Sequence, residues 1–386
     1  AAVDAAQVEL VKRTERFNAF RRDLPAVLGG ARVLVNTLAW ESGVPGDALS
    51  LLSRRLEELA AQPSQRIRPR AGDPATAEKP GIVWVQAASD AGGSVWGGAF
   101  LDANANGTME FAPAADPLPA ANWLPELNFL GVRSPTGEIT PEVAADTRMR
   151  FTIQWREPLD PNQPAADRPA YPVVLHVFRQ LDPAGEKIPS DEMAEAARSV
   201  GGPYRILLTD TYVVYEQILE FTAQVAGRYA LVVATGYQAP PLLPALKREV
   251  EAYPRLVVET LSARRGDPRV VFRSYATKHA GVGVPGDSFG VITVGTGAAG
   301  ELVGGGPGVT LREKPDLFAP EAATAGGNTL RGPGIASGYV GGLGAVLVQT
   351  GSAGPNVFRS AGVEPGKPAV VPEVWLKQLR PARPAK

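Results

Sequence analysis

Apolar positions at helical and strand spacing organise the first ninety residues. The spacing predicts one helix before residue 21 and a second that starts at the N-cap Asp47 and ends near Ala61. Their apolar faces comprise Val8, Val11, Phe17 and Phe20, and Leu49, Leu52, Leu56 and Leu59. Strands are predicted over 31–37 and 81–88, and the second is apolar on both faces, which is typical of a buried parallel strand. Strand, helix and strand in this order predict a βαβ crossover.

The helical period is absent from about residue 112 to residue 240, where apolar and polar residues alternate in short runs between Pro, Asp and Gly turns. The runs are Met149–Trp155, Tyr171–Phe178, Arg205–Leu208, Tyr215–Phe221 and Arg228–Ala234. This pattern predicts an antiparallel β-sandwich. A further hairpin-like pair, Leu256–Leu261 and Arg269–Tyr275, belongs either to the sandwich or to the flanking domain.

Helix and strand periods of the first kind return near the C-terminus. A strand is predicted from residue 290 and a helix from about Gly334 to Val348. We therefore expect an α/β domain made of residues 1–111 and 278–386, with a β-sandwich of residues 112–277 inserted into it. The end of the insert is placed between 240 and 277.

Four segments, in order, carry a resemblance to a known family. Residues 332–347 read GPGIASGYVGGLGAVL, residues 314–320 read KPDLFAP, residues 290–295 read GVITVG and residues 81–92 read GIVWVQAASDAG. They resemble the subtilisin-like serine proteases (subtilases), whose nucleophile segment reads GTSMASPHVAGLAALL. The resemblance implies a subtilisin-like parallel sheet flanked by helices. The end of the insert, residues 217–233, is similar to the pre-peptidase C-terminal modules.

The resemblance also implies that the chemistry has been lost. The family's catalytic serine falls on Gly334, and glycine has no side chain with which to attack a carbonyl. The family's oxyanion asparagine falls on Asp90, whose carboxylate would repel the developing negative charge. We therefore interpret the chain as a degenerate, non-catalytic subtilase-like protein with a structural or protein-binding role.

The family's catalytic aspartate and histidine precede the strand that corresponds to 31–37, where this chain has about thirty residues. Neither His176 nor His279 lies in the family's HGT context. The expected sheet is therefore incomplete at its N-terminal side, and we expect a protein partner or the missing N-terminal fragment at the open edge. The alternative function is a serine endopeptidase fragment or subunit whose other catalytic residues lie on a missing segment or partner chain.

A second motif suggests a metal. Residues 102–110 follow the D-x-N-x-N-G pattern of calcium loops, and the glycine permits a sharp turn. The predicted ligands of a structural Ca²⁺ are Asp102, Asn104, Asn106, the carbonyl of Thr108 and Glu110, while Pro113 occupies the position of the usual bidentate carboxylate. The alternative is an Asn-Gly turn that hydrogen-bonds to itself.

Composition limits the remaining classes. A net charge of −1 indicates no nucleic-acid surface, and no run approaches the ~20 apolar residues of a membrane helix. The chain has no cysteine, which excludes disulfides and leaves the compartment open. No signal peptide is visible, and the resemblance to exported proteases implies a secreted or cell-envelope location. A carbohydrate platform of Trp155, Tyr171, Tyr212 and Tyr215 is a third possibility for the sandwich, although strand aromatics are more often core.

Overall fold

The structure is a computed structural model, and it describes the following residues. These are 33–37, 39, 53, 56–57, 83–89, 93–98, 100, 102, 106–111, 125–158, 173–181, 193–208, 212–235, 254–261, 263, 267–276, 282–283, 285–288, 290–296, 315–319, 322–325 and 328–349. The chain divides into two compact units. One comprises Gly92–Ala280 with Ala1–Leu10 and Ser42–Pro45, and the other comprises Val11–Glu41, Gly46–Ala91 and Gly281–Lys386.

The second unit contains a parallel sheet with the strand order β1-β2-β14-β15. Its strands are β1 (Val33–Asn36), β2 (Val83–Ala87), β14 (Ile292–Thr296) and β15 (Leu317–Ala319). The prediction that segments 31–37, 81–88 and 290–295 share one parallel sheet is therefore confirmed. A hairpin of β16 (Ala322–Ala325) and β17 (Asn328–Arg331) precedes the helix α4 (Pro333–Gln349).

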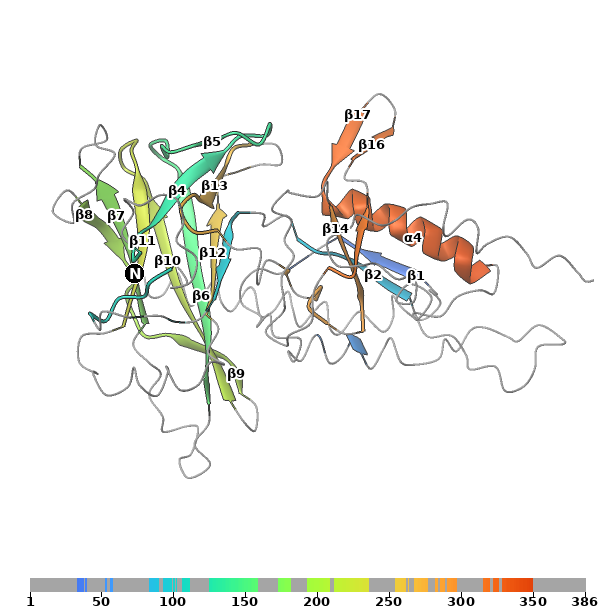
Figure 1. The fold of residues 1–386 in the computed structure, drawn as a ribbon, viewed down its shortest axis with the longest axis horizontal. Coiled ribbons are helices and arrows are strands. Elements are labelled where there is room, and N and C mark those ends of the chain that lie inside the picture. The colour runs from blue at the N-terminus through green and yellow to red at the C-terminus, as the bar shows by residue number, and fades with distance from the viewer. Residues whose placement is uncertain are drawn as a thin grey trace, which may run out of the picture. The chain divides into compact units, whose positions relative to one another are not determined.

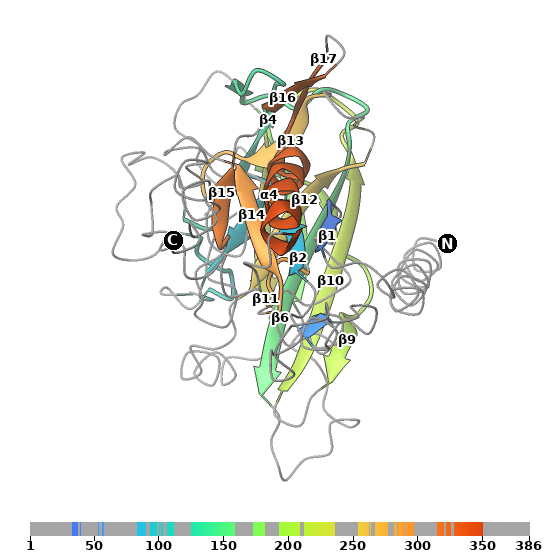
Figure 2. The same cartoon turned by 90° about the vertical axis from the view of Figure 1, so that its right-hand side faces the viewer.

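Helix α4 covers one face of this sheet, as Figure 2 shows. Ala336 and Val340 of the helix pack on apolar residues of the sheet, which are Val83, Val85, Ile292, Val294, Leu317 and Ala319. The helix approaches β1 closely at a glycine, because a Cβ on Gly341 would lie 2.2 Å from Cγ2 of Val35. The period of apolar residues in the sequence thus identified both the helix and the face that it buries.

The first unit is a sandwich of two antiparallel sheets (Figure 1). One has the order β3-β12-β6-β10-β9, with β3 (Val95–Gly97), β12 (Arg255–Thr260), β6 (Arg148–Pro158), β10 (Tyr212–Thr222) and β9 (Tyr204–Leu208). The other has the order β13-β4-β11-β7-β8, with β13 (Arg269–Phe272), β4 (Asn128–Arg133), β11 (Tyr229–Thr235), β7 (Val173–Gln180) and β8 (Met193–Arg198). The short β5 (Ile139–Thr140) pairs with β4.

Alternate residues of both sheets meet in one apolar core. Met149, Phe151 and Ile153 of β6 are fully buried there, while Arg148 and Arg150 lie on the opposite face of the sheet. Phe111 links two other aromatic residues of the core, since its ring meets Trp96 edge-on at 5.3 Å and stacks on Tyr275 at 6.1 Å. The alternation in the sequence therefore reports which face of each strand is inside.

Two predictions need correction. The fold class, an α/β protein with a parallel sheet flanked by helices, is wrong, because the described residues lie mainly in β-strands and α4 is the one helix whose bounds they give. The class was inferred from motifs at the two ends of the chain, whereas the sandwich between them supplies most of the described structure. The pair 256–261 and 269–275 is also not a hairpin, since β12 pairs with β3 and β6, and β13 pairs with β4.

Candidate functional site

The position matched to the catalytic serine lies in the first turn of α4. Gly332 precedes the helix with φ at 115°, a backbone conformation that favours glycine, and its carbonyl accepts the N–H of Ile335 at 3.0 Å. A Cβ on Gly334 would face Cβ and Cγ2 of Thr37, each at 3.4 Å, and meet no other described atom within 4 Å outside its own helix and chain neighbours. The hydroxyl of Ser337 donates to the carbonyl of Gly334 at 2.9 Å. The position therefore has neither a nucleophile nor a base beside it among the described residues.

Polar side chains at the adjacent ends of β1 and β2 bind one another. The Oε1 atom of the buried Gln86 accepts hydrogen bonds from Nδ2 of Asn36 at 2.8 Å and from Nε1 of Trp84 at 3.2 Å. Its Nε2 atom donates to the carbonyl of Ala87 at 3.0 Å. These amide and indole groups fix the strand ends, and none of them titrates near neutral pH.

Asp90, matched to the oxyanion asparagine, lies outside the described residues. The chain just before it is well held. The N–H of Ala88 donates to the carbonyl of Val294 at 2.9 Å, and the carbonyl of Ala88 accepts the N–H of Gly283 at 3.0 Å. Of the two histidines, His279 also lies outside the described residues, while Nδ1 of His176 lies 3.1 Å from Oε1 of Glu195 on the sandwich sheet of β7 and β8.

A buried cluster of hydroxyl and carboxyl groups in the second unit was missed by the sequence analysis. The hydroxyl of Ser53 donates to Oδ1 of Asp287 at 3.3 Å, and the hydroxyl of Ser288 lies 3.3 Å from Oε1 of Glu57. Both serines are fully buried, so no substrate reaches their hydroxyl oxygens. The cluster ties the helical residues 53 and 57 to the loop before β14 and offers no catalytic surface.

The predicted calcium loop is held together by its first residue. Asp102 is buried, and its Oδ1 and Oδ2 accept the backbone N–H groups of Asn106 at 3.0 Å and of Gly107 at 3.2 Å. Oδ1 of Asn106 accepts the N–H of Thr108 at 2.8 Å. Asn104 lies outside the described residues, and the described part of the chain has no group of three or more acidic or histidine side chains suited to a metal. The geometry supports the self-bonded turn, and Ca²⁺ remains a prediction.

Calcium binding predicts a rise in thermal stability. If a folded-state site of weak, extracellular type exists, with a dissociation constant of about 10⁻⁴–10⁻³ M, millimolar Ca²⁺ will raise the unfolding midpoint by mass action. The measurement is thermal unfolding in millimolar Ca²⁺ and in chelator, with Mg²⁺ as the control ion. Asp102→Ala should abolish the difference. An equal midpoint in both solutions for the unmodified protein would leave only the self-bonded turn.

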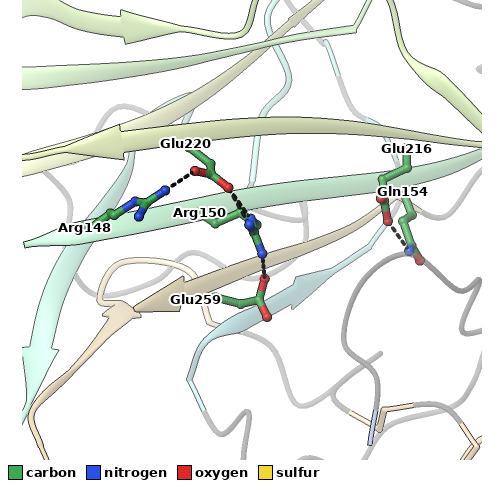
Figure 3. A network of polar contacts seen from close by, with 6 residues as sticks. All are labelled: Arg148, Arg150, Gln154, Glu216, Glu220 and Glu259. Carbon is green, nitrogen blue, oxygen red and sulfur yellow. Dashed lines mark hydrogen bonds and ion pairs between the residues drawn. The ribbon is translucent and has the colours of Figure 1, made fainter. Parts of the chain in front are cut away.

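Charged residues form a cross-strand network on the outer face of the sandwich (Figure 3). In the strand register, Arg150 of β6 lies opposite both Glu220 of β10 and Glu259 of β12. Its Nε donates to Oε1 of Glu220 at 2.9 Å, its Nη2 bonds to the same oxygen, and its Nη1 lies 3.9 Å from Oε2 of Glu259. Arg148 donates to Oε2 of Glu220 at 2.9 Å. The alternating charges along β6 were a visible signal, but only the register shows their partners.

The network shifts the ionisation of Glu220. Partial burial by itself would raise the pKa of this carboxyl, but the hydrogen bonds and positive charges of Arg150 and Arg148 outweigh burial and hold the pKa below its ordinary value of 4.5. Inside the sandwich, burial followed by the charge of Glu126 raises the pKa of the Tyr275 hydroxyl above its ordinary value. Both shifts accompany structural contacts and identify no acid–base pair.

The aromatic platform proposed for carbohydrate is not formed. Trp155 and Tyr215 are buried in the sandwich core, where their rings stack at 5.8 Å. Tyr212 lies under the guanidinium of Arg156, 4.8 Å from the ring centroid, and Tyr171 lies outside the described residues. The physical reason is the strand period, which turns the alternate residues 155 and 215 inward.

Comparison with known proteins gives one weak likeness. No family model matches the sequence, and no curated protein matches it. Among solved structures, the chain is similar to the CspB protease of Clostridium perfringens with 14% identity and a TM-score of 0.47, covering 96% of this chain and 72% of that one. This is a weak likeness to a protease and carries no argument about activity. In the described part of the chain, no helix has both the length and the apolar character needed to cross a membrane.

Proposed function

We propose that this chain is a non-catalytic, protease-like protein whose role is to bind a protein partner. The observation that carries the proposal is the environment of Gly334, where the first turn of α4 faces only the exposed Thr37. The position has the helix and the strand ends that a nucleophile would need, but no reactive side chain. The resemblance to exported proteases supports a secreted or cell-envelope location.

Strand β1 is the surface that we propose for the partner. It is the terminal strand of the parallel sheet, and no other described strand pairs with its outer side. Val35 is 40% exposed, and the following Thr37 is exposed as well. An extended segment of a partner protein would satisfy the backbone groups along this edge by adding a strand, a common mode of peptide recognition.

Activity measurements distinguish this proposal from a serine endopeptidase. We expect no labelling by a fluorophosphonate probe and no hydrolysis of peptide substrates. Gly334→Ser should fold, because a Cβ at this position contacts Thr37 at an ordinary distance of 3.4 Å, and should remain inactive because it gains a hydroxyl without a base. Stoichiometric labelling of the unmodified protein would establish the alternative, an enzyme fragment or subunit.

Hydrogen exchange tests the edge. The probe is a panel of unstructured polypeptides of mixed sequence, titrated onto the whole chain. Bound polypeptide should slow amide exchange in β1, and Val35→Pro, which distorts this edge, should weaken binding. Tight binding that protects only strands of the sandwich would place the partner surface elsewhere and refute the role of β1.

A further inference from the structure

Asn106-Gly107 is the one Asn-Gly pair in the sequence. An asparagine before glycine is chemically unstable, because glycine has no side chain to hinder attack of its backbone nitrogen on the asparagine side chain. Asn106 is exposed, and Gly107 has φ at 81°, in the left-handed region. The pair is therefore accessible to water and lies in a tight bend.

The fold restrains both reacting groups of this pair. Oδ2 of Asp102 holds the N–H of Gly107 at 3.2 Å, so the attacking nitrogen is tied to a buried carboxylate. Oδ1 of Asn106 is held by the N–H of Thr108 at 2.8 Å, and its Nδ2 donates to Oε1 of Glu126 at 3.4 Å. The carboxylate of Asp102 also disfavours loss of the Gly107 proton, because the resulting amide anion would lie beside a like charge.

The far side of the bend is anchored as well. The carbonyl of Gly107 accepts the N–H of Thr235 at 2.7 Å and its hydroxyl at 3.1 Å. Thr108 forms a bridge with Ala234 at the end of β11. Rotation of the Asn106-Gly107 peptide toward the side chain therefore requires release of bonds on both sides of the bend.

We propose that Asn106 is a site of spontaneous deamidation whose rate Asp102 controls. In the reaction, the nitrogen of Gly107 loses its proton and bonds to Cγ of Asn106, and the bond from Cγ to Nδ2 breaks to release ammonia. Water then opens the cyclic imide at either carbonyl, giving aspartate or isoaspartate. Breaking the bonds from Asp102 is the step that the fold opposes.

Deamidation would alter the loop that contains it. The amide that donates to Glu126 becomes a carboxylate, which places two negative charges where the structure has a hydrogen bond of 3.4 Å. Isoaspartate also lengthens the backbone between two residues that Asp102 holds. We expect the modified loop to release the carboxylate of Asp102 and to loosen from the end of β11.

Peptide mass spectrometry of the aged protein tests the proposal. The whole chain, a synthetic peptide of residues 100–111 and the variants Asp102→Ala and Glu126→Gln are incubated at mildly alkaline pH with a chelator. The folded protein should deamidate at least about tenfold more slowly than the peptide, since two bonds to a charged group must open first. Asp102→Ala should approach the rate of the peptide, and the matched Glu126→Gln, which touches only the exposed amide, should stay near the unmodified protein.

Two results would overturn the proposal. One is an equal rate in the unmodified protein and the peptide, a comparison that needs no variant. The other is an unchanged rate in an Asp102→Ala protein whose β11 amides remain protected from hydrogen exchange. If that variant loses protection throughout the sandwich, Asp102→Asn replaces it, because one oxygen remains to accept a single N–H, and it should give an intermediate rate.

Discussion

Replacing Gly341 with alanine will destabilise the second unit by about 1–3 kcal/mol, the cost of forcing an extra methyl group into a packed contact. A Cβ at this position would lie 2.2 Å from Cγ2 of Val35 and 3.5 Å from its Cβ. Valine is stiff at χ1, so its side chain has few alternatives to displacement. The measurement is the denaturant midpoint of the whole chain together with hydrogen exchange of β1 and β2.

Gly342→Ala is the matched control, because it is the same change one residue further along the helix. Nothing lies within 4 Å of a Cβ at Gly342, so this variant should gain about 0.5–1 kcal/mol from helix propensity alone. The double variant Gly341→Ala with Val35→Ala should recover most of the loss. If Gly341→Ala and Gly342→Ala change stability alike, α4 does not pack on β1 as described.

Replacing Arg150 with methionine will destabilise the sandwich by about 1–3 kcal/mol. The side chain of Arg150 is 9% exposed, and its loss leaves Glu220 and Glu259 without the cation between them. The expected cost lies below that of a fully buried pair because the Glu220 and Glu259 side chains are 36% and 33% exposed and solvent screens them. Arg148→Met is the control, since that side chain is 59% exposed and its loss should cost about 0–1 kcal/mol.

The same network predicts a dependence of stability on pH. The folded-state pKa of Glu220 lies below 4.5, so its contribution is present above pH 4.5 and is lost as the pH falls through the folded-state value. Acid titration of the unfolding free energy should show this loss in the unmodified protein and a smaller one in Arg150→Met. A loss of equal size in both proteins would mean that other carboxylates are responsible.

Part of the fold could be predicted because local periodicity reports burial directly. The apolar run 81–88 and the helix predicted from Gly334 became β2 and α4, and the alternation in residues 149–155 identified the inner face of β6. The fold class failed because a resemblance carried by terminal motifs does not weigh the structure between them. The predicted hairpin failed because neighbours in sequence, β12 and β13, entered different sheets.

The candidate site shows the same division. The absence of a side chain at Gly334 is written in the sequence, and so is the D-x-N-x-N-G pattern after Asp102. The sequence could not show that the carboxylate of Asp102 faces the N–H groups of Asn106 and Gly107, which makes the loop self-bonded whether or not it holds a cation.

By itself, then, the sequence determined the residue types at each position, and with them the lost nucleophile and the inner faces of strands and helix, because both depend only on side-chain chemistry and local period. The tertiary structure alone decided which strand edges and charges meet. Arg150 lies between Glu220 and Glu259 because β6 runs between β10 and β12 in one register, although these residues are 70 and 109 positions away along the chain. Pairing over such separations is set by the closure of the whole sandwich around its core, which no local pattern encodes.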